Sequence, residues 1–331
     1  MEIYLASRWF LAVSTIVVLL PAPRISIAAD EEKICVTTYT YKTVDGLNIK
    51  ADVHRTDDSQ LRPVVVWIHG GALIMGHREG FSDRVRTAML DAGYCFVSID
   101  YRLAPETQLP WIIEDIEDAF TWIHKQGPSL FYADTSRIAV MGGSAGGYLT
   151  LVTGYRINPV PTVLVPFWGY GDLVGEWYSA PSPHERHYRT KMSKEEAWQQ
   201  VSGPPIADSR DRKGDGGGFY QFCRQHGSWP NSVSGWDPRT QGDKFIPFMP
   251  VKNVTADYPP TLMIHGTSDT DVPYEQSVMM AEEFQKYGVE YKLISIRNGE
   301  HGLGGGDPKK IDEAYEAAFA FVNSRLTAQS N

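Results

Sequence analysis

The sequence contains only three cysteines, Cys35, Cys95 and Cys223, among its 331 residues. So few thiols at irregular spacing exclude a disulfide framework and a cysteine-ligated metal site. Cys95 lies in an apolar run and is expected to be a buried core thiol. Cys35 and Cys223 are able to pair only in an oxidising compartment, and the sequence leaves that pairing open.

Basic runs are also missing, and the formal net charge is −9 with a pI near 5.5. This charge balance argues against nucleic acid and against an anionic membrane surface as partners. The chain has no internal repeat. Its content of 42% hydrophobic and 21% charged residues is typical of a globular protein with a substantial core.

No apolar run is long enough to span a bilayer, which takes about 20 residues. The apolar stretch of residues 9–20 is shorter, follows Arg8, and is followed by small residues at Ala28 and Ala29. This order is typical of a secretory signal peptide. We therefore expect residues 1–29 to be a signal peptide, the mature protein to be secreted or periplasmic, and no stable membrane anchor to remain.

The sequence does contain a regular alternation of apolar runs and helix-compatible segments. Continuous apolar runs predict strands that are covered on both faces, as in a parallel sheet. The expected strands are 63–68, 94–99, 137–141, 163–167, 260–264 and 291–296, and the expected helices are 81–91, 111–126, 145–155, 274–286 and 309–326. A hairpin of residues 34–41 and 47–54 precedes them, because Asp45-Gly46 is a turn signal.

The predicted fold class is therefore α/β, a mostly parallel, doubly covered sheet with an N-terminal hairpin. The alternation stops at residues 171–258, a stretch too long for a structureless loop in a compact domain. We interpret 171–258 as a cap inserted into a catalytic domain of residues 30–331, with short helices at 194–201 and 219–226. Its aromatic residues are expected to form the cap's own small core, with pocket walls as the competing interpretation: Trp177, Tyr178, Phe219, Tyr220, Trp229 and Trp236.

The strand predicted at 137–141 runs directly into Gly142-Gly-Ser-Ala-Gly146 and then into a helix. A strand that turns at once into a helix holds the middle residue in a strained turn, so the residues two positions away must be small. Gly142 and Gly146 meet that need and leave the Ser144 hydroxyl exposed. The pattern indicates a nucleophilic serine, and the competing interpretation is a glycine-rich loop that only turns the chain.

A serine nucleophile needs a base, and the base needs an orienting carboxylate. Functional groups gather at the carboxyl ends of parallel strands, where Asp269 and His301 follow the last two predicted strands. The resulting order Ser144, Asp269, His301 is that of a hydrolase triad. The competing acids are Asp271, better explained as a helix cap, and Asp172. Two competing histidines, His69 and His265, are expected to bind loop backbone. Three others are expected to lie on the surface of the cap, with substrate contact as the competing interpretation: His184, His187 and His226.

An acyl-transfer site also needs backbone N–H groups directed at the oxygen that becomes negative. The segment His69-Gly70-Gly71-Ala72 follows the strand predicted at 63–68. We expect Gly70, Gly71 and Ala145, the residue after the serine, to supply this oxyanion hole. The competing interpretation is an ordinary Gly-Gly loop.

The chain resembles α/β-hydrolases of the esterase and lipase type in its His301 loop and in four motifs: His69-Gly-Gly71, Asp100-Tyr-Arg-Leu-Ala-Pro-Glu106, Gly142-Gly-Ser-Ala-Gly146 and His265-Gly-Thr-Ser-Asp269. The second motif is similar to hormone-sensitive-lipase-like esterases, in which Arg102 and Glu106 would act structurally. The last resembles dienelactone-hydrolase and prolyl-oligopeptidase relatives. Ala72 departs from the hormone-sensitive-lipase type, which usually has a third glycine there, and the resemblance does not extend to the cap.

These features together predict a secreted serine hydrolase that cleaves small-molecule carboxylic esters through an acyl-enzyme, without a metal or an organic cofactor. A prolyl-oligopeptidase-like peptidase would use the same triad, but such enzymes generally carry a large N-terminal propeller. A non-catalytic binding protein of the hydrolase fold usually loses the serine or the histidine, and both are present here. The sequence leaves the acyl group, the alcohol and the oligomeric state open.

Overall fold

The structure is a computed structural model, and it describes residues 33–327. The predicted signal peptide, residues 1–29, lies outside the described residues. Between residues 33 and 327, no helix has both the length and the apolar character that crossing a membrane would require.

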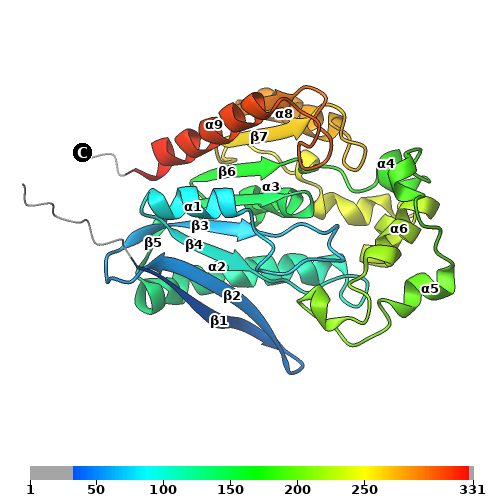
Figure 1. Cartoon of the computed structure of the whole chain (residues 1–331), viewed down its shortest axis with the longest axis horizontal. Coiled ribbons are helices and arrows are strands. Elements are labelled where there is room, and N and C mark those ends of the chain that lie inside the picture. The colour runs from blue at the N-terminus through cyan, green and yellow to red at the C-terminus, as the bar shows by residue number, and fades with distance from the viewer. Residues whose placement is uncertain (1–32, 328–331) are drawn as a thin grey trace, which may run out of the picture. The chain divides into compact units, whose positions relative to one another are not determined.

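The strands of the described residues form one eight-stranded sheet in the order β1-β2-β4-β3-β5-β6-β7-β8 (Figure 1). The strands β1 and β2 pair antiparallel, as do β2 and β4, and every other neighbouring pair is parallel. This arrangement confirms the predicted α/β class with its N-terminal hairpin. The bounds are β1 Ile34–Val44, β2 Leu47–Thr56, β3 Arg62–Ile68, β4 Cys95–Ile99, β5 Ala133–Gly143, β6 Val163–Phe167, β7 Thr261–Gly266 and β8 Tyr291–Ile296.

The hairpin turn is the one that its sequence predicts. Val44 pairs with Leu47, so Asp45 and Gly46 form a two-residue turn, and their φ angles are +49° and +85°. Both residues lie in the left-handed region that matches the twist of the flanking strands.

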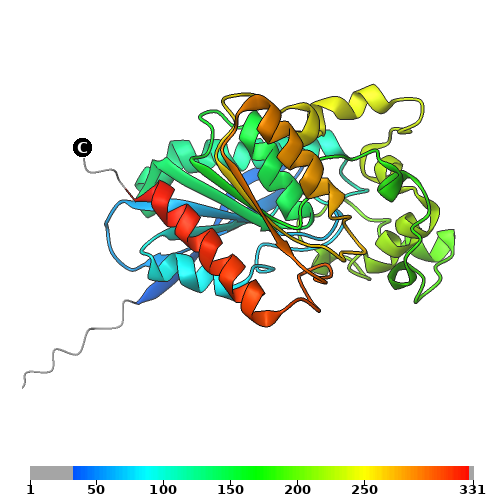
Figure 2. The same cartoon turned by 90° about the horizontal axis from the view of Figure 1, so that it is seen from above.

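Helices cover both faces of the sheet (Figure 2). The helices α1 (Asp83–Asp91) and α9 (Pro308–Leu326) pack on one face, and α2 (Leu109–Phe131), α3 (Ala145–Arg156) and α8 (Glu275–Tyr287) pack on the other. Along β3, Val64 and Val66 belong to one buried cluster, whereas Val65 and Trp67 belong to the other. The apolar run is therefore covered on both faces, as predicted.

Several predicted boundaries were wrong, among them the start of β5, which lies at Ala133 and not at residue 137. The helix expected to end at residue 126 continues to Phe131 and ends at Tyr132, which has a left-handed φ of +51°. Pro128 lies inside this helix. The extra turn brings Phe131 into the core, where its side chain is buried.

Between β6 and β7 the chain forms short helices beyond the carboxyl ends of the parallel strands (Figure 1). We call residues 171–258 the cap. Two of its helices, α5 and α6, lie where the sequence predicts helices. The cap elements are α4 Glu176–Ser179, α5 Lys194–Gln199, α6 Gly217–His226, α7 Trp229–Ser234 and the 3-10 turns η1 Glu185–His187, η2 Ser209–Asp211, η3 Gly242–Phe248 and η4 Pro250–Lys252.

The aromatic side chains of the cap are core residues, as expected, but the core is not the cap's own. Phe219 and Trp229 are fully buried in the same cluster as Val66 of the sheet. The rings of Tyr178 and Trp229 stack with centroids 4.0 Å apart. The cap is therefore joined to the sheet by a continuous apolar core.

Cys95 is a buried thiol in β4, as predicted, and burial raises its pKa to about 12. Cys35 and Cys223 are unpaired thiols in this structure.

Candidate active site

Ser144 occupies a strained turn between β5 and α3. Its φ is +57° and its ψ is −120°, a conformation that is rare for a residue with a side chain. A Cβ on Gly142 would lie 2.5 Å from the carbonyl oxygen of Gly146, and a Cβ on Gly146 would collide with the carbonyl oxygen of Ile68. Both glycines are therefore required, as the sequence predicts for a nucleophile elbow.

The loop that follows β3 lies directly beside this serine. A Cβ on Gly70 would lie 3.3 Å from the Cβ of Ser144, and Gly71 has a left-handed φ of +103°. Among the described residues, the N–H groups of Gly70, Gly71 and Ala145 donate to no protein acceptor. These three backbone donors therefore have no partner among the described residues, and Gly70 and Ala145 lie beside Ser144.

Asp269 and His301 lie together beyond the ends of β7 and β8. Nδ1 of His301 lies 2.8 Å from Oδ2 of Asp269, whose Oδ1 accepts the N–H groups of Asp271 and Val272. Burial acts to raise the pKa of Asp269, but hydrogen bonds from His265 and His301 outweigh it and hold that pKa well below the usual range. Asp269 is therefore a buried, ionised carboxylate that orients the imidazole.

Trp168, which the sequence analysis did not single out, lies between the two parts of the site. Its indole atoms would lie 3.3 Å from a Cβ on Gly143, and its ring is 6.2 Å from that of His301. The sequence could have indicated Trp168, because this residue directly follows β6, at the edge of the sheet where functional groups gather. Within residues 33–327 no hydrogen bond joins Ser144 to His301, and in free enzymes such contacts are often loose.

The competing acids have other roles in this structure. Asp172 accepts the N–H groups of Val174 and Gly175 within its own loop. The prediction that Asp271 caps a helix was wrong, because α8 begins at Glu275 and Tyr274 holds its N-cap position without a side-chain hydrogen bond. Asp271 instead accepts a hydrogen bond of 2.6 Å from Tyr220 of the cap.

Among the competing histidines, His69 contacts the carbonyl of Gly70 at 2.8 Å and His265 that of Val272 at 3.0 Å, as predicted. His226 is exposed, so its predicted position on the surface of the cap is confirmed. The surface prediction was wrong for His187, which is fully buried. Burial lowers its pKa to about 4, so its ring is neutral at pH 7.

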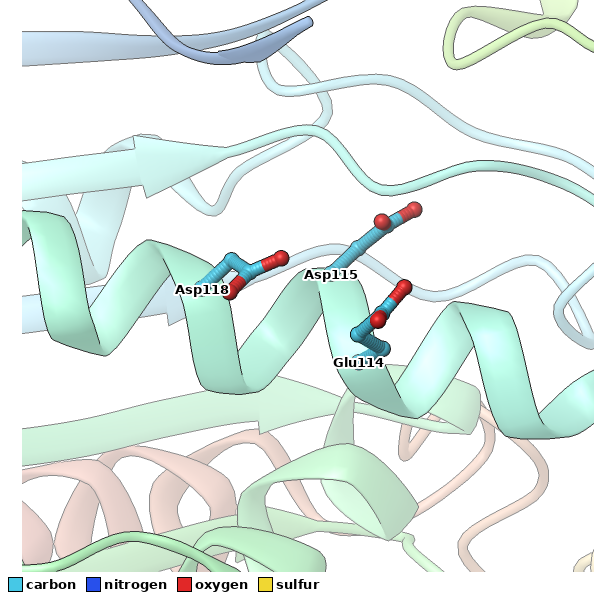
Figure 3. A group of neighbouring side chains, drawn as sticks. All are labelled: Glu114, Asp115 and Asp118. Atoms are coloured by element: carbon cyan, nitrogen blue, oxygen red, sulfur yellow. The ribbon is translucent and has the colours of Figure 1, made fainter. Parts of the chain in front are cut away.

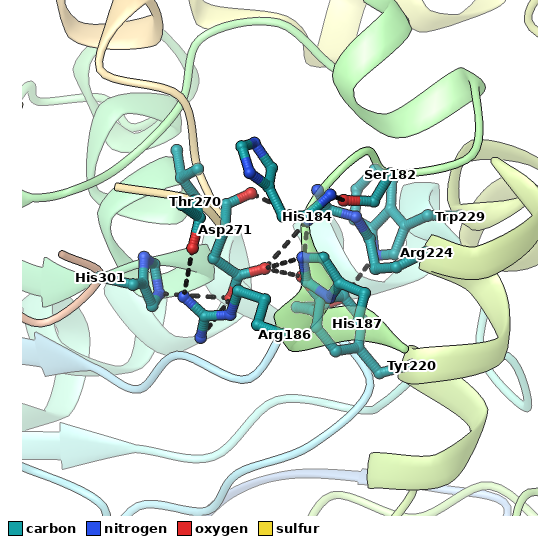
Figure 4. Close-up of polar contacts among 12 residues, drawn as sticks. Ser182, His184, Arg186, His187, Tyr220, Arg224, Trp229, Thr270, Asp271 and His301 are labelled. Carbon is teal, nitrogen blue, oxygen red and sulfur yellow. Dashed lines mark hydrogen bonds and ion pairs between the residues drawn. The ribbon is translucent and has the colours of Figure 1, made fainter. Parts of the chain in front are cut away.

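Figure 4 shows that cap residues surround Asp271 next to His301. Oδ1 of Asp271 lies 3.0 Å from Nη1 of Arg224 and 3.4 Å from Nε2 of His187. Burial acts to raise the pKa of Asp271, but the charges of His301, Arg224 and Arg186 hold it below the ordinary value. A second ionised carboxylate therefore lies at the site.

A pocket of about 520 Å³ opens beside His301. All the residues that line it are hydrophilic: Arg186, Arg189, Thr190, Gln221, Thr270, Glu300 and His301. Small-molecule pockets are usually lined by apolar side chains, so this pocket is unusually polar.

The one cluster of acidic groups in the described residues with a spacing that suits a metal lies elsewhere, on α2 (Figure 3). It comprises Glu114, Asp115 and Asp118. The ammonium group of Lys42 lies 3.0, 2.8 and 2.6 Å from these carboxylates, and Arg102 binds Asp115 as well. Two cations, Lys42 and Arg102, thus already bind this cluster, which agrees with the structural role expected of Arg102.

Glu106, the other residue expected to act structurally, also forms an ion pair. It binds Arg212 of the cap at 2.5 Å, and both side chains are buried.

Among curated proteins, the chain is similar to parts of much longer polyketide synthases. A non-reducing polyketide synthase of Penicillium roqueforti is 27% identical to this chain over 86% of this chain's length. A non-reducing polyketide synthase of Stereocaulon alpinum is also 27% identical, over 80% of this chain's length. The chain spans only about an eighth of each of these relatives, 13% and 12%.

Three solved structures share the fold. A protein of unknown function from Staphylococcus aureus has a TM-score of 0.69 at 22% identity, covering 88% of this chain and all of that one. A truncated carbohydrate esterase from gut microbiota (TM-score 0.62, 19% identity) covers 89% of this chain and 98% of its own. For a butyrate-bound esterase from Thermogutta terrifontis (TM-score 0.61, 19% identity), the match covers 89% of this chain and 96% of the esterase.

Two families match successive parts of the chain. Residues 52–161, which include the elbow, match the BD-FAE family. Residues 205–329, which include Asp269 and His301, match the prolyl oligopeptidase family. The chain therefore has the α/β-hydrolase fold, and it is similar to the BD-FAE family in its first part and to the prolyl oligopeptidase family in its last part.

Proposed function

We propose that this α/β-hydrolase is a serine esterase that cleaves carboxylic esters with the triad Ser144, His301 and Asp269. The observation that carries the proposal is the 2.8 Å contact between Asp269 and Nδ1 of His301. This contact commits Nδ1 to the carboxylate and leaves Nε2 to act as the base. The strained serine and its neighbouring backbone donors complete the set of groups that acyl transfer needs.

In the proposed reaction, Oγ of Ser144 attacks the carbonyl carbon of the ester while Nε2 of His301 removes the hydroxyl proton. The N–H groups of Gly70, Gly71 and Ala145 stabilise the negative oxygen of the tetrahedral intermediate. His301 then returns the proton to the leaving alcohol. A water molecule, activated by the same imidazole, hydrolyses the acyl-enzyme and releases the acid.

The hydrophilic pocket beside His301 supports a polar alcohol as the leaving group. His301 protonates that alcohol, so the space next to its imidazole is the place where the alcohol departs. A pocket lined by charged and amide groups favours hydroxyl-rich alcohols over alkyl chains. A structural neighbour is a carbohydrate esterase, and we propose esters of short acids with hydroxyl-rich alcohols as the substrate class.

A series of p-nitrophenyl esters from acetate to palmitate tests the reaction, with the Ser144→Ala variant as control. We expect the protein to turn over the short esters and the variant to lose at least about a thousandfold of kcat. Glyceryl triacetate and hexyl acetate then test the leaving group, and glyceryl triacetate is expected to give the higher kcat/KM. Equal background rates from both proteins would refute the esterase proposal.

A second candidate is a peptidase, because residues 205–329 match the prolyl oligopeptidase family. It would use the same three side chains. Prolyl p-nitroanilide peptides distinguish the two activities: cleavage of these amides that depends on Ser144, at a kcat/KM above that for the esters, would favour the peptidase.

We also propose that the protein is exported, on the basis of the signal-like residues 1–29. Expression of the full chain followed by N-terminal sequencing of the exported protein tests this. A mature N-terminus near residue 29 or 30 is expected, and retention of Met1 in the cell would contradict it.

A further inference from the structure

Asp271 receives contacts from two segments of the cap. Tyr220 and Arg224 of α6 donate hydrogen bonds of 2.6 and 3.0 Å to its Oδ1. Arg186 and His187 of η1 lie 3.6 and 3.4 Å from its two oxygens. Asp271 is 8% exposed as a residue, and these contacts hold its carboxylate from the other side of the site (Figure 4).

That orientation directs the second oxygen at the catalytic histidine. Oδ2 of Asp271 lies 3.8 Å from Nε2 of His301. Asp269 meets the opposite nitrogen, Nδ1, at 2.8 Å. The imidazole therefore has one carboxylate at each nitrogen, and the two carboxylates are only two residues apart in the chain.

The two contacts have different chemical consequences. The contact of Asp269 is a hydrogen bond and fixes which nitrogen carries the proton in the resting enzyme. The contact of Asp271 is too long for a hydrogen bond. At this distance it is an electrostatic interaction, which becomes favourable when Nε2 acquires the proton of Ser144 and the ring becomes positive.

Arg186 ties the same carboxylate to the histidine loop. Its guanidinium donates to Glu300, the residue before His301, at 3.0 Å, while its other end lies near Asp271. The N–H of His301 donates to Glu300 at 2.8 Å. One cation of the cap therefore contacts both loops that carry the proposed acid and base.

We propose that Asp271 is a positioning residue that acts through His301: it uses contacts with the cap to hold a negative charge beside Nε2, and so stabilises the imidazolium that forms during acyl transfer. This inference rests on the proposed function. It also adds a role for the cap: besides lining the pocket, the cap would hold the negative charge of Asp271 next to His301.

The Asp271→Asn variant isolates the charge. Its amide oxygen still accepts from Tyr220 and Arg224, and its amino group replaces Oδ2 beside His301. Because the imidazolium exists only along the reaction path, we expect kcat and kcat/KM for p-nitrophenyl acetate to fall together, by about tenfold or more, with KM changed less than threefold. Phosphonate titration of Ser144 gives the concentration of active sites for every variant.

The Tyr220→Phe variant is the matched control. It removes one hydrogen bond of the same network but keeps the charge of Asp271. We expect its kcat to stay within threefold of wild type even where its Tm falls as far as that of Asp271→Asn. The Asp271→Glu variant, which retains the charge, is expected to recover part of the activity that Asp271→Asn loses.

The outcomes separate this inference from the esterase proposal. If wild type hydrolyses esters through Ser144 and Asp271→Asn has an unchanged kcat per active site, the role of Asp271 is refuted and the esterase stands. Equal losses of kcat in Asp271→Asn and Tyr220→Phe would show that the charge of Asp271 has no special effect, and would refute its positioning role. If wild type neither hydrolyses esters nor reacts with the phosphonate, both proposals fall.

Discussion

Replacing Asp269 by asparagine exchanges one oxygen for an amino group and leaves the shape of the side chain unchanged. Oδ1 accepts the N–H groups of Asp271 and Val272 at 2.8 and 2.9 Å, so the amide oxygen of the variant stays there. The amino group then faces Nδ1 of His301 across 2.8 Å. Two donors cannot share this contact, so His301 is driven to carry its proton on Nε2 and cannot accept that of Ser144.

We expect kcat for p-nitrophenyl acetate to fall about 10⁴-fold, as the equivalent exchange does in serine proteases, which corresponds to about 5 kcal/mol of transition-state stabilisation. The fold should be retained because the two hydrogen bonds to Oδ1 remain, and circular dichroism during thermal unfolding checks this. A kcat within tenfold of wild type in the folded variant would refute Asp269 as the orienting acid.

Three further predictions concern the frame of the site. In Gly146→Ala the new methyl group collides with the carbonyl of Ile68, so we expect the yield of folded protein or the phosphonate-reactive fraction to fall at least about tenfold; a fully reactive variant would contradict the elbow geometry. Burial lowers the pKa of His69 to about 4, so the unfolded chain binds a proton at a higher pH than the folded protein does. The free energy of unfolding is therefore highest above pH 6.5 and falls by about 3 kcal/mol as the pH drops to 4. Urea unfolding of His69→Phe should therefore be less pH-dependent than that of wild type, and parallel curves would disprove this. Trp229 donates a buried hydrogen bond of 2.9 Å to the carbonyl of Ala72, beside the glycines proposed to form the oxyanion hole. Trp229→Phe should lower the unfolding free energy by about 1–3 kcal/mol and reduce kcat more than it raises KM, whereas a changed KM alone would contradict a role in holding the loop.

The positions of the strands and of the proposed triad could be predicted because both follow from local rules. An apolar run such as residues 63–68 has few options besides a strand covered on both faces. A glycine two residues before and after Ser144 indicates the elbow directly. Asp269 and His301 were found because the carboxyl ends of parallel strands meet at one edge of the sheet.

The environment of Asp271 could not be predicted, because it depends on contacts between distant segments. Its partner Tyr220 is 51 residues away, in a cap without a regular pattern. Its position before Pro273 favoured a helix cap, and tertiary contacts outweighed that local preference. His187 was misplaced for the same reason, since its burial arises from packing against Tyr220 and the acid loop.

The continuous core of cap and sheet has a consequence for how substrates enter and how specificity changes. Phe219 and Trp229 cannot leave the cluster that they share with the strands without exposing large apolar rings to water, at about 1.5–3 kcal/mol for each side chain of this size. We therefore expect the cap to stay packed on the sheet rather than to open as a lid. A chimaera with the cap of a relative would leave these rings without matching neighbours. New substrate preferences in this scaffold are better sought by single exchanges at exposed pocket residues, such as Arg189.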